Sequence, residues 1–259
     1  MSSPKKYALI TGGSRGIGAE IALGLACKGV HVVINYINNQ DAAAGVVKQI
    51  KDLGVEAHAI RAHIGDKKSR AELMVEYDKL FPKLDYFIAN AAIGVFKPMT
   101  ELSLNSIKKV FAVNVESFLE LTQQAVKRMG SSENDSVIAG SVGRIVALSS
   151  LGAEKALPNY GSVGASKAAM ESMARQFAVE LGPQGINVNV VRAGLVDTGI
   201  LRYVSDRDQI LKETCEKTPN RRITTTKEVA DLVCFLTGKE SSMINGQTLM
   251  VDGGQSATV

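Results

Sequence analysis

A tyrosine and a lysine seven positions apart, Tyr160 and Lys167, are the residues of this chain best suited to chemistry. They follow closely on the pair Ser149 and Ser150. A phenol, an amine and a hydroxyl near one another can deliver a proton to a substrate oxygen or stabilise negative charge on it. We predict catalytic roles for Tyr160, Lys167 and Ser150; the alternatives are that Tyr160 only packs at a helix start and that Ser150 only caps a turn.

The elements that must position these residues follow an alternating pattern along the chain. Short apolar runs, expected as strands, cover 7–11, 30–35, 55–60, 84–89, 144–148, 186–191 and 248–251. Segments with helical spacing cover about 17–28, 40–53, 66–80, 103–129, 160–181 and 226–237. This order predicts an α/β fold, a single domain over 1–259 with a Rossmann-type, doubly wound parallel sheet of about seven strands. Segment 195–225 lacks a clear period, and we expect a mobile substrate flap there.

A glycine-rich turn follows the first expected strand and opens the first helix. Its residues are Thr11, Gly12, Ser14, Arg15, Gly16, Ile17 and Gly18. Glycines allow a backbone to approach a pyrophosphate closely, and the N–H groups at a helix start attract the anion. The turn therefore predicts a dinucleotide site. The alternative is a tight turn that binds no ligand, but such a turn need not stand between the first strand and the first helix of an α/β chain.

The end of the second strand indicates which dinucleotide is bound. An NAD site usually has an acid there that accepts the ribose hydroxyls, but after Asn35 the first carboxylate is Asp41. Arg15 offers a charge-assisted contact to a 2′-phosphate. We predict NADPH in preference to NADH, with Asn35 near the cofactor; the alternative is that Arg15 is only a solvated turn residue.

Taken together, these motifs resemble the short-chain dehydrogenases/reductases over essentially the whole chain. Outside the glycine turn, the residues that carry the resemblance are Asn90, Ala91, Ala92, Asn114, Ser149, Ser150, Lys167, Gly194, Thr198 and the stretches 245–247 and 252–254. The family usually has Asp-Val at the adenine, where this chain has His63 and Ile64, and Pro-Gly where it has Ala193 and Gly194.

The resemblance implies a role for each matching position. Asn90, with Ala91 and Ala92, would lie along the cofactor. Lys167 would hold the nicotinamide ribose and make the phenol a better donor, and Asn114 would support a water relay to this lysine. Thr198 would contact the carboxamide, in one cofactor segment with Gly194 and Val196. His63 and Ile64 would contact the adenine through their backbone.

The position of the tyrosine departs from most of the family. Most members place it four residues before the lysine, where this chain has Val163. The two positions share a helix face but differ by about 4.5 Å in rise. The Tyr-x6-Lys spacing resembles the NADPH-dependent enoyl-acyl-carrier-protein reductase III branch. This implies reduction of an enoyl thioester, carried by acyl carrier protein or coenzyme A, in fatty acid or related acyl-chain biosynthesis. The alternatives are a carbonyl reductase, acting on a 3-oxoacyl thioester or a secondary-metabolite ketone, and a non-catalytic NADP(H)-binding protein.

Composition and charge exclude several other classes of protein. The net charge is +4 with scattered basic residues, which argues against nucleic acid as the main partner. No apolar run approaches the ~20 residues of a membrane span, and no signal segment precedes the first strand, so we expect a soluble, cytoplasmic protein. The three cysteines and three histidines have no ligand spacing, so we expect reduced, mostly buried thiols and no metal. The family resemblance implies a homo-oligomer, a dimer or a tetramer.

Overall fold

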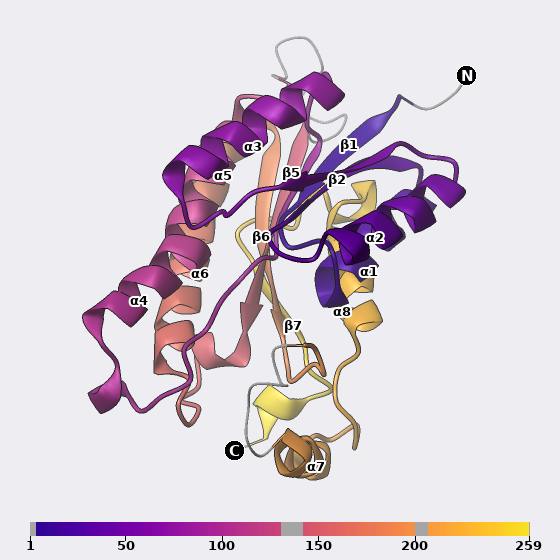
Figure 1. Ribbon diagram of the computed structural model, residues 1–259. Coiled ribbons are helices and arrows are strands. Elements are labelled where there is room, and N and C mark those ends of the chain that lie inside the picture. The colour runs from indigo at the N-terminus through magenta and orange to yellow at the C-terminus, as the bar shows by residue number, and fades with distance from the viewer. Residues whose placement is uncertain (1–3, 131–141, 200–206, 259) are drawn as a thin grey trace.

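A parallel sheet of seven strands forms the centre of the molecule in the computed structural model, which describes residues 4–130, 142–199 and 207–258. The strand order is β3-β2-β1-β4-β5-β6-β7 (Figure 1). The strands are β1 (Lys6–Ile10), β2 (Val30–Tyr36), β3 (Ala57–Arg61), β4 (Tyr86–Ala89), β5 (Gly143–Ser150), β6 (Ile186–Ala193) and β7 (Thr248–Val251). The predicted doubly wound sheet is confirmed. Because β1 pairs with both β2 and β4, the strand order reverses there, which is where such sheets bind ligands.

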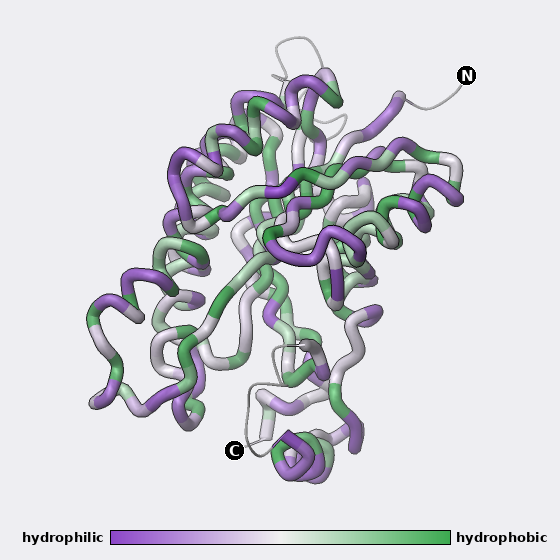
Figure 2. The backbone as a smooth tube through the Cα atoms, in the orientation of Figure 1, coloured by the Kyte–Doolittle hydropathy of each residue, from purple (hydrophilic) through white to green (hydrophobic). Residues whose placement is uncertain are grey.

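Helices cover both faces of the sheet (Figure 1). The α-helices of the described residues are α1 (Gly16–Cys27), α2 (Gln40–Asp52), α3 (Lys67–Leu80), α4 (Leu104–Phe111), α5 (Ser117–Val126), α6 (Gly161–Leu181), α7 (Arg207–Lys217) and α8 (Thr226–Leu236). Of these, α7 lies below the sheet in Figure 1, apart from both faces. One core packs α3, α5 and α6 against the sheet through Leu73, Phe118 and Met170. The other packs α1, α2 and α8 through Ile21, Val46 and Val233. Figure 2 shows hydrophobic residues along the central strands and hydrophilic ones along the outer helices.

The predicted helix over 103–129 is interrupted. A π-helix, Ala112–Glu116, separates α4 from α5 and contains the buried Asn114. Such insertions are frequent at functional sites. The apolar spacing could not reveal this one, because a single wider turn shifts the helical period only slightly.

The expected flap over 195–225 contains a helix, α7, over residues 207–217. None of the α7 residues is fully buried, and its partly buried positions are Arg207, Ile210, Leu211, Thr214 and Cys215. Only three of these five are apolar, so the helical period is weak in the sequence. Residues 200–206 of the expected flap lie outside the described residues.

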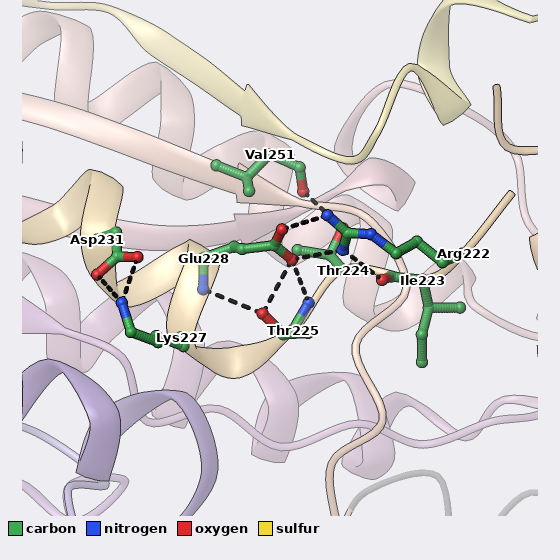
Figure 3. Close-up of polar contacts among 8 residues, drawn as sticks. All are labelled: Arg222, Ile223, Thr224, Thr225, Lys227, Glu228, Asp231 and Val251. Carbon is green, nitrogen blue, oxygen red and sulfur yellow. Dashed lines mark hydrogen bonds and ion pairs between the residues drawn. The ribbon is translucent and has the colours of Figure 1, made fainter. Parts of the chain in front are cut away.

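Both ends of the segment that contains α7 are anchored to the fold. Val196 pairs with Thr224 in a parallel bridge, and the Thr224 hydroxyl donates to the Val251 carbonyl at 3.1 Å. Next to it, Thr225 caps α8 by accepting from the Glu228 N–H at 3.2 Å, and Glu228 pairs with Arg222 at 2.5 Å (Figure 3). The stems of the segment thus lie together at the carboxyl end of β7.

None of the helices in the described part of the chain is long and apolar enough to cross a membrane. Within the same residues Cys27, Cys215 and Cys234 are free thiols. The expectation that they are mostly buried is wrong, because Cys234 is buried, Cys215 is partly buried and Cys27 is exposed.

Candidate active site

The glycine turn forms a cradle at the switch point of the sheet. The backbone of Gly12 has a φ of +66°, which favours glycine. A Cβ on Gly18 would lie 2.4 Å from the Gly12 carbonyl oxygen, so no larger residue fits there. Helix α1 starts at Gly16 with Arg15 as its N-cap, without a side-chain cap and without an acid in its first turn. Its first N–H groups therefore suit a pyrophosphate, and the residues present fit the predicted dinucleotide.

Ser14 and Ile17 lie in the same turn, both partly buried. The predicted members of the turn are thus together in space as well as in sequence. Arg15 is exposed. Its guanidinium lies 3.5 Å from the position that a Cβ on Gly199 would take.

Hydrogen bonds between Thr11 and Asn90 tie the turn to β4. The Asn90 side-chain amide donates to the carbonyls of Thr11 at 2.9 Å and Gly12 at 3.1 Å. In return the Thr11 hydroxyl accepts from the N–H groups of Asn90 and Ala91, both at 3.1 Å. Ala91 and then Ala92 continue the chain past the cradle, both partly buried. The amide of Asn90 therefore shapes the loop that would hold the cofactor.

The side chain of Asn35 braces the neighbouring strand, and its predicted contact with the cofactor stays a prediction. Asn35 is 2 % exposed, and its side-chain amide donates to the Ala62 carbonyl at 3.0 Å. The amide hydrogens of Asn35 thus join the ends of β2 and β3. The exposed residues that follow β2 are Ile37, Asn38 and Asn39. Sequence reasoning could not see this, since polarity alone does not say where an amide points.

His63 and Ile64 form a braced turn after β3. His63 is exposed, and its Nδ1 accepts from the Gly65 N–H at 3.1 Å. Ile64 is buried, and its carbonyl accepts from the buried Arg70 at 2.7 Å. The turn is therefore rigid, in keeping with the predicted role of its backbone.

The segment after β6 reaches back to the glycine turn. Gly194 donates from its N–H to the Val251 carbonyl at 2.9 Å, and Val196 is fixed by its bridge to Thr224. Thr198 lies over the cradle, because a Cβ on Gly16 would be 3.7 Å from its methyl carbon. The structure thus brings Thr198 to the cofactor cradle, as the prediction requires. Helix α7 is tied to the same place by the ion pair Arg207–Asp197 at 2.6 Å.

Tyr160 is the N-cap residue of α6, and its phenol meets Ser150. The Ser150 hydroxyl donates to the phenol oxygen at 2.9 Å and accepts from the Gly152 N–H at 3.2 Å. The phenol's own hydrogen is then left for another acceptor. Burial raises the pKa of Tyr160, and the hydrogen bond from Ser150 opposes this rise. The phenol is thus a protonated donor near neutral pH.

Val163 occupies the position four residues before Lys167, and it is packed in an apolar contact. It is 5 % exposed, and a Cβ on Gly94 would lie 2.7 Å from one of its methyl carbons. Phe96 lines the same region, with its ring centroid 5.8 Å from that of Tyr160. The place of the usual tyrosine therefore offers no proton donor, and the phenol stands at the start of the helix.

Lys167 is 5 % exposed, and its ammonium donates to the Leu148 carbonyl at 2.6 Å. Burial lowers the pKa of Lys167 to about 8, and the charge of Glu171 opposes this. Within the described residues, the groups that act on the pKa of Tyr160 are its burial and Ser150. The expectation that Lys167 makes the phenol a better donor stays a prediction. The lysine is directed to the strand end, and the serine to the phenol.

Comparison with known proteins agrees with this geometry. The family model described as "Enoyl-(Acyl carrier protein) reductase" matches residues 12–256. The chain belongs to this family of short-chain dehydrogenases/reductases. It is an oxidoreductase, and the resemblance seen in its motifs is confirmed.

Two curated relatives and one solved structure illustrate the range of the family. The chain is 39 % identical to 1-cyclohexenylcarbonyl-CoA reductase of Streptomyces collinus, covering 97 % of this chain and 87 % of the relative. It is 32 % identical to versicolorin reductase 1 of Aspergillus parasiticus, covering 96 % and 95 %. A short chain dehydrogenase from Burkholderia cenocepacia, solved in complex with NADP, is 33 % identical with a TM-score of 0.86, covering 96 % of this chain and 97 % of the other.

In this reductase, Asn114 connects three elements without touching the lysine directly. Its side chain makes two hydrogen bonds of 3.0 Å with the backbone of Ile93 and donates to the Ser166 hydroxyl at 2.9 Å. Ser166 precedes Lys167, so Asn114 fixes the start of α6 against the loop after β4. The predicted water relay stays a prediction.

Gly152 is a residue of the reductase site that sequence reasoning missed. A Cβ there would lie 2.4 Å from the Cδ1 of Tyr160, and a Cβ on Gly164 would lie 2.5 Å from the Gly152 carbonyl oxygen. The phenol ring therefore lies directly on the Gly152 backbone, and α6 packs against it. The only signal in the sequence was a glycine two positions after Ser150. Elsewhere, no group of metal-ligating side chains gathers within the described ranges.

Proposed function

We propose that this protein reduces the double bond of an enoyl thioester with NADPH, the acyl group being carried by coenzyme A or acyl carrier protein. The observation that carries the proposal is the displaced donor. The phenol of Tyr160 is held by Ser150 at the start of α6, while Val163 fills the usual place of the tyrosine. The donor would therefore meet a substrate oxygen about 4.5 Å nearer the start of the helix than a tyrosine at the position of Val163 would.

NADPH as the cofactor is supported by the cradle and by Arg15. The open N-terminus of α1 suits the pyrophosphate, and the exposed guanidinium of Arg15 at the mouth suits a 2′-phosphate. The NADP bound in the Burkholderia structure supports the same assignment. When bound, NADPH supplies a hydride to the β-carbon. Lys167 and Thr198 would hold the nicotinamide end, at the ribose and the carboxamide.

The phenol acts on the oxygen of the thioester. As the β-carbon is reduced, negative charge builds on that oxygen, and the free hydrogen of the Tyr160 phenol stabilises it most strongly in the transition state. Ser150 donates to the phenol oxygen, so it stabilises charge left on the phenol when the proton moves. The apolar packing of Val163 and Phe96 excludes water beside the ring, which strengthens these contacts.

Carbonyl reduction is the second candidate, and Ser150 favours it. A serine hydrogen-bonded to a phenol equally suits a ketone oxygen that becomes an alkoxide. The names of the relatives support both reactions, since one contains a cyclohexenylcarbonyl thioester and another is versicolorin reductase 1. The displaced phenol is our reason for proposing enoyl reduction ahead of carbonyl reduction.

Oxidation of NADPH with matched thioesters tests the assignment. Crotonyl-CoA, 1-cyclohexenylcarbonyl-CoA and acetoacetyl-CoA are compared at equal concentration, with NADH in a parallel series. We expect turnover of at least one enoyl thioester and a preference for NADPH. Turnover of acetoacetyl-CoA alone would establish the carbonyl reductase. Binding of NADPH without turnover of any substrate would indicate a non-catalytic protein.

The cellular setting follows from this substrate class. Carrier-bound acyl chains are built in the cytoplasm, where we place the protein, in fatty acid or related acyl-chain biosynthesis. The homo-oligomer implied by the family, a dimer or a tetramer, is tested by light scattering after gel filtration. A monomer at micromolar concentration would contradict it.

A further inference from the structure

A buried ion pair lies behind the lysine of the site and has no part in the mechanism so far. Glu171 on α6 and Arg192 on β6 are joined by two hydrogen bonds, Nε to Oε1 at 3.0 Å and Nη2 to Oε2 at 2.5 Å. Glu171 is 5 % and Arg192 8 % exposed. The Ser149 hydroxyl also donates to Oε1 of Glu171, and Arg192 also pairs with Glu154.

This network lies next to each part of the candidate active site. Glu171 follows Lys167 by four residues, so the two side chains lie on the same face of α6. The two side chains also reach neighbouring residues of β5, since Lys167 donates to the Leu148 carbonyl and Glu171 accepts from the Ser149 hydroxyl. Ser149 precedes Ser150, and Glu154 comes two residues after Gly152, on which the phenol lies. The network is therefore adjacent to the lysine, the serine and the support of the phenol.

Stability alone is a weak reason for such a pair. Removing two charges from water is costly, and replacing a buried pair with apolar residues of similar size is often neutral. We therefore look for the function of these four polar side chains in their effect on Lys167.

Burial lowers the pKa of Lys167, and the negative charge of Glu171 raises it. Among the described residues, Glu171 is the charged group that acts on this pKa. The charged and titratable groups on the surrounding elements are Arg192 on β6, Glu154 after β5, Tyr160 at the start of α6, and the exposed Lys108, Lys109 and Glu116 on α4 and the π-helix. Of these, Arg192 is the one that holds the Glu171 carboxylate.

We propose that Glu171 and Arg192 are positioning residues that keep the Lys167 ammonium charged in the active site. Glu171 supplies a negative charge one helical turn from Lys167, and Arg192 holds that buried carboxylate in place. The inference rests on the proposed function only in that Lys167, as a cation, holds the nicotinamide ribose.

The pH dependence of NADPH binding tests this without any substrate. Deprotonation of Lys167 removes the positive charge that holds the nicotinamide ribose. NADPH affinity should therefore fall as the pH rises through about 8. The variant E171Q removes the charge that favours the ammonium. In E171Q, we expect this fall in NADPH affinity, the alkaline limb of the pH profile, to move to lower pH by about one pH unit. The fall of kcat/KM at alkaline pH should move with it.

Three further variants separate the charge effect from folding. E171Q/R192M removes both charges and leaves no buried ion alone, so it stays folded if E171Q does not; because it also removes the cation that opposes the ammonium, its limb should move less than that of E171Q. R192K keeps a cation beside Glu171 and should keep the wild-type limb. The matched control E180Q changes an exposed glutamate on the same helix and should leave the limb unmoved.

The outcomes separate this inference from the proposed function. An unmoved limb in folded E171Q would overturn the role of the pair, as would a limb moved to lower pH in R192K or a wild-type protein whose NADPH affinity is flat from pH 7 to 9. A limb that moves as expected in a protein that reduces only ketones would support the pair and overturn enoyl reduction.

Discussion

Replacing Gly152 with alanine places one methyl group against the phenol of the site. The new Cβ would lie 2.4 Å from Cδ1 and 2.5 Å from Cε1 of Tyr160. Carbon atoms in contact stay about 3.5–4.0 Å apart, so the ring must retreat by about 1 Å or more. The backbone of Gly152 is not left-handed, so alanine itself is tolerated there.

The size of the effect follows from this displacement. The hydrogen bond from Ser150 to the phenol is 2.9 Å long, and a shift of that size takes it beyond hydrogen-bond range. A misplacement of about 1 Å in a catalytic group costs on the order of 100-fold in rate. We therefore expect the kcat of Gly152→Ala to fall about 100-fold, whereas NADPH affinity stays unchanged because the cradle lies on other loops.

The assay is steady-state oxidation of NADPH with the best enoyl thioester, together with a fluorescence titration of NADPH. Gly45→Ala is the matched control, because a Cβ on that glycine of α2 meets nothing within 4 Å. It should keep full activity. A Gly152→Ala protein with wild-type kcat would refute the reasoning, since it would show that the ring need not lie where the structure places it.

Two further predictions concern the phenol and the lysine. Tyr160→Phe should lower kcat by about 10²–10⁴-fold with NADPH binding intact; NADPH oxidation and titration check this, and unchanged turnover would remove Tyr160 from the mechanism. The folded-state pKa of Lys167 is about 8 and lies below its ordinary value of 10.5. Between pH 8 and 10.5 the unfolded chain therefore binds more protons than the folded protein. The free energy of unfolding should then rise with pH in this range, by at most about 3 kcal/mol. Urea unfolding at pH 7.5 and 10 should show this rise in the wild type and not in Lys167→Met; an equal rise in both would contradict the burial of a charged lysine.

The fold could be predicted from the sequence because its signals are local. Apolar runs and helical spacing gave each strand to within about three residues, and the glycine turn identified the cradle. Helix α7 was missed because its apolar residues are few, Ile210, Leu211 and Cys215, and the π-helix at Asn114 because one wide turn barely alters the apolar period.

The site was harder to predict, since its decisive contacts join residues that no spacing relates. Tyr160 and Lys167 were found, but the sequence could not show that the phenol pairs with Ser150 while the ammonium turns to the Leu148 carbonyl. The pairing of Glu171 with Arg192 depends on how α6 crosses β6. The orientation of the Asn35 amide depends likewise on the neighbouring strand.

The hydrogen bonds between Thr11 and Asn90 have a consequence for how the cofactor arrives. Four of them close the glycine turn onto β4 with protein groups alone. The loop is therefore preorganised, and little conformational entropy is lost when a nucleotide enters it. Association should then be limited by diffusion and by steering toward Arg15, with no slow ordering of the cradle beforehand.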